Sequence, residues 1–280
     1  MKRAFLCGIN YTGTSDALNG CINDVSNINK FLVEKCGYDP KSIMIITDDP
    51  KSPQQPTKKN MELAFNWLIK DCQAGDTLLF HYSGHGATVK DTNGDETDKL
   101  DSVLVPVDYL KSGVITDDWL YSNVVCKLPS GVTLWGFTDC CHSGTMLDLT
   151  FNLQSNSSYK NGSLKDNIKY NDADWSSRFV LTNERTKQCA ADVYLFSGCL
   201  DAQTAADATI RNQAQGAFTS CLLECLNSNL VKTSNGKTTI DKKICDILKE
   251  IDCRLIIGGF SQRSQLSMGK MKDFDKKFSL

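Results

Sequence analysis

Two stretches of the chain decide its fold: Thr77-Leu-Leu-Phe-His-Tyr-Ser-Gly-His-Gly86 and Val132-Thr-Leu-Trp-Gly-Phe-Thr-Asp-Cys-Cys-His-Ser-Gly144. Each begins with a short apolar run that is typical of a buried strand and ends in a polar turn with glycine. Similar short runs occupy residues 4–9, 43–47, 103–105 and 193–197. Helical spacing of apolar residues is present in residues 22–36, 63–72 and 222–226. This alternation predicts an α/β fold with a central, mostly parallel sheet flanked by helices.

Composition narrows the kind of protein. The 280 residues carry 31 Lys and Arg against 33 Asp and Glu, a net charge of −2, which argues against nucleic acid as a partner. No run approaches the roughly 18 apolar residues of a membrane span. The 13 cysteines are scattered without paired CxxC spacing, which favours reduced thiols and a cytoplasmic protein. We expect one domain, residues 1–280, with no membrane partner.

Reactive side chains follow both stretches. The carboxyl ends of parallel strands form the ligand-binding edge of such a sheet, so the two turns should face one crevice. Of the three histidines, His81 lies within an apolar run and is expected in the core. His142 adjoins Cys141, and neighbouring side chains in extended backbone point to opposite faces. His85, between two glycines, is left as the base for a Cys141 nucleophile.

Four segments together resemble the metacaspases: Gly20-Cys-Ile-Asn-Asp24, His81-Tyr-Ser-Gly-His-Gly86, Asp139-Cys-Cys-His-Ser-Gly144 and Ser197-Gly-Cys-Leu-Asp-Ala-Gln-Thr204. The resemblance implies a caspase-like three-layer sandwich and a thiol protease that hydrolyses peptide bonds after Arg or Lys. Matched motif to motif, the dyad histidine is His85 and the nucleophile is Cys141. By the same likeness, residues 1–150 are large-subunit-like, 152–177 form a flexible linker and 190–280 are small-subunit-like.

The resemblance also implies a specificity pocket at Asp24, Ser83 and Asp139. A pocket for a guanidinium or ammonium group needs carboxylates, because a buried cation without an anion is costly. Asp139 stands two residues before Cys141, the right spacing to share its cleft. The alternative role for Asp24 is that of a helix cap or turn. We expect the backbone amides of Gly86 and Cys141 to stabilise the oxyanion.

Calcium is the cofactor that the resemblance implies, because many metacaspases require it. The aligned carboxylates are Asp101, Asp117, Asp118 and Asp148, hard oxygen ligands of the kind that Ca²⁺ takes. Asp148 follows Cys141 closely, so an ion there could order the loop that carries the nucleophile. The alternative is a solvated acidic face.

Self-processing is a further expectation for the linker. Its basic residues suit both a flexible cleavage site and the implied specificity: Lys160, Lys165, Lys169 and Arg178. The interval after Cys141 is short, as in short-linker (type I-like) metacaspases, and the chain begins almost at its first strand, without the prodomain that many of them carry. Metacaspases are generally monomers, which is our expectation for this chain.

Three other interpretations compete with a peptidase. A catalytically silent caspase-like module would bind or regulate, but such a protein should have lost His85 or Cys141. A structural zinc site would need His81, His85, Cys140 and Cys141 at spacings unlike those of zinc fingers. A nucleotide-binding domain would need a glycine-rich phosphate motif after the first strand, and Gly8-Ile-Asn-Tyr-Thr-Gly13 is too loose a match.

Overall fold

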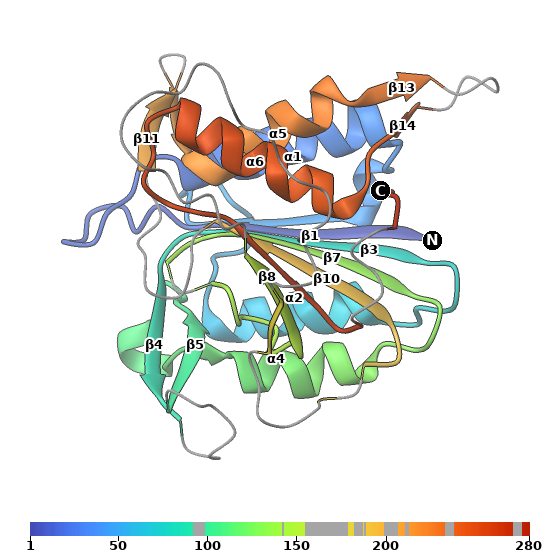
Figure 1. Cartoon of the computed structure of the whole chain (residues 1–280). Helices are drawn as coiled ribbons and strands as arrows, with labels where there is room; N and C mark the ends of the chain where they lie inside the picture. Colours follow the sequence, from blue (N-terminus) through green and yellow to red (C-terminus); the bar gives the residue numbers. More distant parts are fainter. Residues whose placement is uncertain are drawn as a thin grey trace.

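The structure, a computed structural model, describes residues 1–91, 99–141, 143–154, 179–181, 187, 189–198, 207–210, 213–232, 238–270 and 276–280. In this part of the chain the centre is an eight-stranded sheet in the order β2-β1-β3-β7-β10-β15-β8-β9 (Figure 1). The strands in that order are Ile43–Thr47, Lys2–Gly8, Thr77–Ser83, Thr133–Asp139, Asp192–Ser197, Gln265–Met268, Phe151–Gln154 and Phe179–Leu181.

The predicted parallel sheet is confirmed for five of its six apolar runs. Strands β2, β1, β3, β7 and β10 pair in parallel, while β15, β8 and β9 extend the sheet in antiparallel pairing. The sixth run, residues 103–105, was wrongly assigned to this sheet. It belongs mainly to β5 (Leu100–Leu104), which lies in a separate antiparallel sheet with β4 (Gly86–Lys90) and β6 (Ile115–Thr116).

Helices cover both faces of the central sheet (Figure 1). On one face lie α1 (Cys21–Cys36), α5 (Ala217–Ser228) and α6 (Ile244–Ile257); on the other lie α2 (Lys58–Ile69) and α4 (Asp117–Asn123). Strand side chains alternate between the two hydrophobic cores, as a two-residue repeat requires. Ala4 and Leu6 of β1 join the α1–α5–α6 core, whereas Phe5 and Cys7 join the α2–α4 core. The expected three-layer sandwich is confirmed.

Local capping explains where several helices begin and end. The Thr57 hydroxyl accepts the Asn60 N–H at the start of α2, and the Thr116 hydroxyl accepts the Trp119 N–H at the start of α4. Helix α1 ends at Gly37, whose φ of 69° is readily adopted by glycine and closes a hydrogen bond to Leu32.

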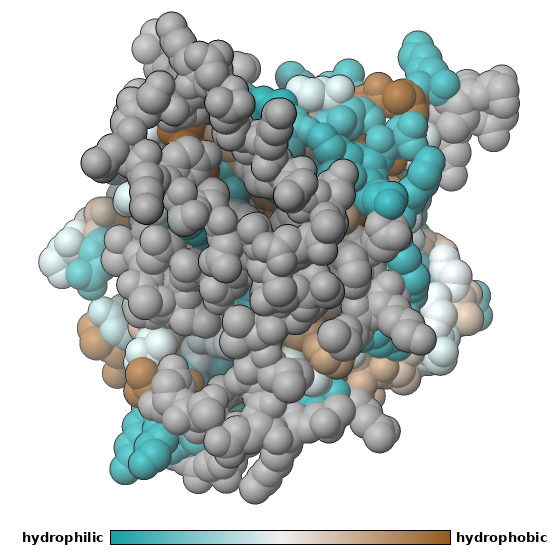
Figure 2. Space-filling view, in the orientation of Figure 1, coloured by the Kyte–Doolittle hydropathy of each residue, from teal (hydrophilic) through white to brown (hydrophobic). Residues whose placement is uncertain are grey.

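The remaining elements are peripheral. Two hairpins, β11–β12 (Asp207–Ile210 and Gln213–Gly216) and β13–β14 (Leu230–Lys232 and Thr238–Ile240), flank the helical layer of α1, α5 and α6. The short helices are α3 (Tyr109–Ser112), η1 (Pro40–Ser42) and η2 (Val125–Lys127). Hydrophilic side chains gather over the upper helical layer (Figure 2). No helix in the described residues is both long and apolar enough to span a membrane.

Candidate active site

The turns that carry His85 and Cys141 lie side by side. Strands β3 and β7 are neighbours, and Ser83 pairs in register with Asp139, so His85 and Cys141 each stand two residues beyond one matched pair. The Gly84 N–H donates to the Asp139 carbonyl at 3.4 Å. The two turns therefore continue together past the carboxyl edge of the sheet, as the sequence predicts.

Gly86 brings these turns into direct backbone contact. A Cβ atom on Gly86 would lie 2.0 Å from the Cys141 carbonyl oxygen and 3.1 Å from the Cys140 sulfur, so only glycine fits there. The two expected oxyanion donors, the amides of Gly86 and Cys141, thus belong to adjoining backbone segments. Cys140 is fully buried, whereas His85 and Cys141 are both partly exposed. This exposure suits groups that must meet a substrate.

The hydrogen bond of the His85 ring assigns its tautomer. Nε2 lies 2.6 Å from the backbone carbonyl oxygen of Asp16, which can only accept a hydrogen bond. Nε2 of the neutral ring must therefore carry the proton, which leaves Nδ1 as the atom able to take one. Sequence reasoning missed Asp16, because a backbone carbonyl has no side-chain signature.

The three expected pocket residues converge, all of them buried. Ser83 donates its hydroxyl to Oδ2 of Asp24 at 2.7 Å. The N–H of Gly216 donates to both oxygens of the Asp24 carboxylate at 3.0 Å, and the Thr219 N–H donates to Oδ2 of Asp139 at 2.8 Å. The amino end of α5 thus supplies donors to both carboxylates. Asp24 is in the first turn of α1, and these hydrogen bonds join its side chain to β3 and to the residue before α5.

Gly216 stands between the two carboxylates. A Cβ atom there would lie 2.1 Å from Oδ2 of Asp139 and 2.7 Å from Oδ2 of Asp24. Gly198, at the end of β10, also approaches Asp139, with an added Cβ 3.1 Å from Oδ1. Neither glycine was predicted as a site residue, although Gly198 belongs to one of the motifs quoted above. Asp24 and Asp139 thus form a buried anionic pair whose oxygens are met by backbone amides, and paired carboxylates are the chemistry that a basic side chain requires.

The four aspartates expected to bind calcium do not form a metal cage in this arrangement. Asp101, Asp117 and Asp148 are buried, and Asp118 is half-buried. Asp117 is engaged with backbone, accepting the N–H of Ser102 at 2.7 Å and of Asp118 at 2.9 Å. Within the described part of the chain, no three His, Cys, Asp or Glu side chains are grouped so as to hold a metal ion.

A lysine supplies the positive charge beside these carboxylates. The ammonium of Lys187 forms an ion pair with Asp148, and it lies 3.8 Å from an oxygen of Asp118. The same ammonium stands 5.0 Å from the ring centre of Tyr121. Sequence reasoning missed Lys187, which is 39 positions from Asp148 (187 − 148) and carries no motif.

The other predicted residues are accounted for as follows. His81 is fully buried, its Nε2 lies 3.2 Å from the Thr219 hydroxyl, and burial lowers its pKa to about 3, which fits the expected core role. His142 lies outside the described residues. So do the four residues expected to serve self-processing, Lys160, Lys165, Lys169 and Arg178.

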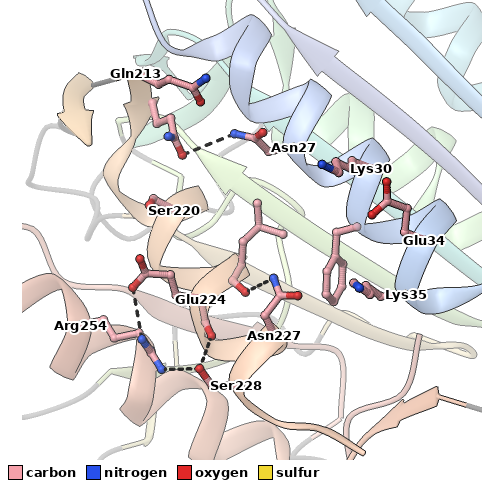
Figure 3. Close-up of a pocket in the computed structure, with 13 residues that line it drawn as sticks. Asn27, Lys30, Glu34, Lys35, Gln213, Ser220, Glu224, Asn227, Ser228 and Arg254 are labelled. Atoms are coloured by element: carbon pink, nitrogen blue, oxygen red, sulfur yellow. Dashed lines mark hydrogen bonds and ion pairs between the residues drawn. The ribbon is translucent and has the colours of Figure 1, made fainter. Parts of the chain in front are cut away.

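A separate groove of about 600 Å³ opens between α1, α5, α6 and β12 (Figure 3). Lys30 and Glu34 line it from α1, while Arg254 from α6 pairs across it with Glu224 of α5 at 3.2 Å. None of the predicted site residues is among its described lining residues. The groove is therefore distinct from the candidate active site.

Fold and site together define a class: three-layer α/β proteins that bring a cysteine and a histidine to the carboxyl edge of a mostly parallel sheet. Comparison with known proteins narrows that class. The family described as "Metacaspase, peptidase C14 domain" matches residues 2–150. The chain belongs to the metacaspase family, as the sequence motifs indicate.

Comparison with individual proteins supports the same family. The chain is 42% identical to Metacaspase-1B of Neurospora crassa over 253 residues, which cover 81% of this chain and 59% of that protein. It is 35% identical to Metacaspase-1 of Meyerozyma guilliermondii over 311 residues, covering 99% of this chain and 72% of the relative. The crystal structure of protein GSU0716 from Geobacter sulfurreducens shares the fold, with a TM-score of 0.63 at 23% identity over 99% of this chain and 97% of that one.

Proposed function

We propose that this protein is a cysteine endopeptidase that cleaves peptide bonds after Arg or Lys. The observation that carries the proposal is the register of the neighbouring strands β3 and β7. Because Ser83 pairs with Asp139, His85 and Cys141 each follow this pair by two residues. Membership of the metacaspases supports the same reaction class. Proteins or peptides with a basic residue before the scissile bond are the proposed substrates, and the working unit is a cytoplasmic monomer.

The reaction follows from the tautomer of His85. Nδ1 takes the proton of the Cys141 thiol, and the sulfur attacks the carbonyl carbon of the substrate. The Gly86 and Cys141 amides donate to the resulting oxyanion. The C–N bond then breaks, the imidazolium protonates the departing amine, and a thioester remains. A water molecule, deprotonated by His85, hydrolyses that thioester and restores the thiol.

We attribute the choice of substrate to the anionic pair. Asp24 and Asp139 accept hydrogen bonds from the same segment, Gly216 to Thr219, and the guanidinium of Arg or the ammonium of Lys would pair with these two carboxylates. An acidic side chain would meet like charges there, so peptides that end in Asp should be rejected.

The decisive experiment compares fluorogenic peptides that differ only in the residue before the dye: Arg, Lys or Asp. Wild type should release dye from the Arg and Lys peptides and not from the Asp peptide. Cys141→Ala should release none, and Cys126→Ala, which removes an exposed cysteine, should match wild type. Hydrolysis by Cys141→Ala at the wild-type rate would refute the proposal, and a folded protein without activity under any ion condition would favour the silent module.

We further propose that calcium regulates the enzyme and that the enzyme processes itself. The four aspartates have the oxygen chemistry that calcium prefers, but Lys187 now supplies the positive charge beside Asp118 and Asp148. Calcium would compete with that ammonium for the same carboxylates. Self-processing is tested by adding calcium to wild type and Cys141→Ala: only wild type should fragment, with a new terminus after a basic residue.

A further inference from the structure

Two buried tyrosines meet the backbone of His85. The His85 N–H donates to the hydroxyl of Tyr11 at 3.1 Å, and the hydroxyl of Tyr82 donates to the His85 carbonyl at 2.7 Å. Tyr11 is 4% exposed and Tyr82 is fully buried. The Tyr11 ring also packs on the imidazole, with ring centres 4.6 Å apart.

The same two hydroxyls contact Val105 on the facing strand segment. The Tyr11 hydroxyl donates to the Val105 carbonyl at 2.6 Å, and the Val105 N–H donates to the Tyr82 hydroxyl at 3.4 Å. Each hydroxyl has one proton to give and lone pairs to accept, so these four hydrogen bonds use both hydroxyls consistently. The bonds form a closed ring through the N–H and carbonyl of both His85 and Val105.

The position of this ring in the β-ladder explains its effect. Strands β4 and β5 pair Ala87 with Val103 and Gly86 with Leu104, so the next pair in that register would be His85 with Val105. In an antiparallel ladder, every second opposed pair exchanges both of its hydrogen bonds directly. At His85 and Val105 the N–H and carbonyl of each residue instead meet a tyrosine hydroxyl, and the ladder ends one pair earlier, at Gly86 and Leu104.

Gly84 leaves room for the two tyrosine hydroxyls beside His85. A Cβ atom on Gly84 would lie 2.7 Å from the Tyr82 hydroxyl and 3.3 Å from the Tyr11 hydroxyl. Tyr11 itself has a φ of 50°, an unusual value for a residue with a side chain, so the fold holds it in a strained backbone conformation. Burial raises the pKa of both tyrosines well above the ordinary value, so both hydroxyls keep the protons that they donate.

We propose that Tyr11 and Tyr82 are positioning residues that fix the His85 backbone, and through it the Nδ1 atom, opposite Cys141. This inference rests on the proposed function, because it takes His85 as the base. Neither tyrosine touches the substrate: both act through His85 alone. Removing either hydroxyl leaves a backbone group of His85 without its hydrogen-bond partner and closes or loosens the spacing of β4 and β5.

The test uses Tyr11→Phe and Tyr82→Phe, with Tyr38→Phe as the matched control. Tyr38 is 3% exposed, and its hydroxyl has no hydrogen-bond partner among the described residues, so its loss should change little. We expect kcat on the Arg peptide to fall about tenfold or more in both test variants with KM within about twofold. The acidic limb of the pH profile of kcat/KM should move, while the control retains the wild-type profile.

A second measurement separates this inference from the peptidase proposal. The rate at which iodoacetamide alkylates Cys141, followed by mass spectrometry across pH, reports the thiol and its base without any substrate. Tyr11→Phe and Tyr82→Phe should shift that profile. Unchanged kinetics and unchanged alkylation in both variants would overturn the positioning role, even in an active peptidase. A shifted alkylation profile in a protein that cleaves no peptide would support positioning and contradict the proposed function instead.

Discussion

At the scale of single residues, two glycines allow backbone segments of the candidate site to approach one another more closely than any other residue would. Gly86 lets the His85 turn contact the Cys141 carbonyl, and Gly216 lets the backbone of α5 approach two carboxylates at once. The sequence predicts the reactive side chains, because they follow strands at recognisable spacing. It does not predict partners such as the Asp16 carbonyl or the Gly216 amide, because backbone groups are common to all residues. Those partners come from segments that only the fold brings together.

The charge of the anionic pair should set the affinity for basic substrates. In Asp139→Asn the amide oxygen can still accept the Thr219 N–H, so the fold should survive while one negative charge is lost. We expect KM for the Arg peptide to rise about tenfold or more, since a charge-assisted hydrogen bond contributes roughly 1.5–3 kcal/mol. Asp241→Asn, at an exposed acid, is the control. An unchanged KM in Asp139→Asn would remove that carboxylate from the pocket.

The lack of a side chain at Gly216 should also be necessary for hydrolysis of basic peptides. Gly216→Ala places a methyl group 2.1 Å from Oδ2 of Asp139, where something must shift. We expect hydrolysis of Arg and Lys peptides to fall about a hundredfold, because a displacement of about 1 Å at a site can reduce activity by this factor. The melting temperature checks that the variant is folded. Full activity would show that the anionic pair does not bind the substrate side chain.

At the scale of elements, continuous apolar strands are predictable from this sequence, and short strands of mixed polarity are not. The sequence predicts a linker from residue 152, yet residues 151–154 form β8 inside the sheet. Its buried Asn152 donates to Gln265 of β15 at 2.9 Å, and Ser267 of β15 donates to the Gly144 carbonyl at 2.5 Å. Apolar residues alternate with polar ones in both strands, Phe151 and Leu153 in β8 and Leu266 and Met268 in β15, but each pattern is only four residues long. So short an alternation is a weak strand signal, which is why neither strand is predicted from the sequence.

The segment between α6 and β15 is another element without a sequence signature. Asp252 of α6 is fully buried and accepts the N–H and hydroxyl of Ser264 at 2.7 and 2.6 Å. Two residues earlier, Gln262 donates to the carbonyl of Gly198, the glycine that approaches Asp139, at 2.7 Å. Through these hydrogen bonds the segment connects α6 to the end of β10.

Asp252 should make stability depend on pH. Burial raises its pKa to about 7, only partly offset by the Ser264 hydrogen bonds. A raised pKa means that the folded state favours the neutral acid, so its stabilising effect is full below about pH 4, the unfolded pKa, and is lost as pH rises through 7. The free energy of unfolding of wild type minus that of Asp252→Asn should fall by about 2–3 kcal/mol from pH 5 to pH 8. Urea denaturation at both pH values measures it, and a difference independent of pH would contradict the assignment.

At the scale of the whole molecule, charge links the two halves of the chain. Lys187, from the second half, forms ion pairs with Asp118 and Asp148. Asp148 lies seven positions after Cys141 (148 − 141). We therefore expect the state of this ion pair to affect the segment that carries the proposed nucleophile. A bound calcium ion and the Lys187 ammonium cannot share the same carboxylate oxygens.

Lys187 should therefore weaken calcium binding. We expect Lys187→Met to bind calcium about tenfold or more tightly than wild type by isothermal titration calorimetry, because removing the ammonium removes a competing ion pair. Lys277→Met, at an exposed lysine, is the control and should match wild type. Equal calcium affinity in Lys187→Met and wild type would contradict the competition.

The most direct test of the central claim is covalent labelling with a peptide chloromethyl ketone that ends in Arg, followed by mass spectrometry of the intact and digested protein. We predict one adduct, located at Cys141 among the 13 cysteines, and its loss in His85→Ala. An adduct on another cysteine, or labelling of Cys141 at the same rate in His85→Ala, would contradict the pairing of that thiol with that imidazole.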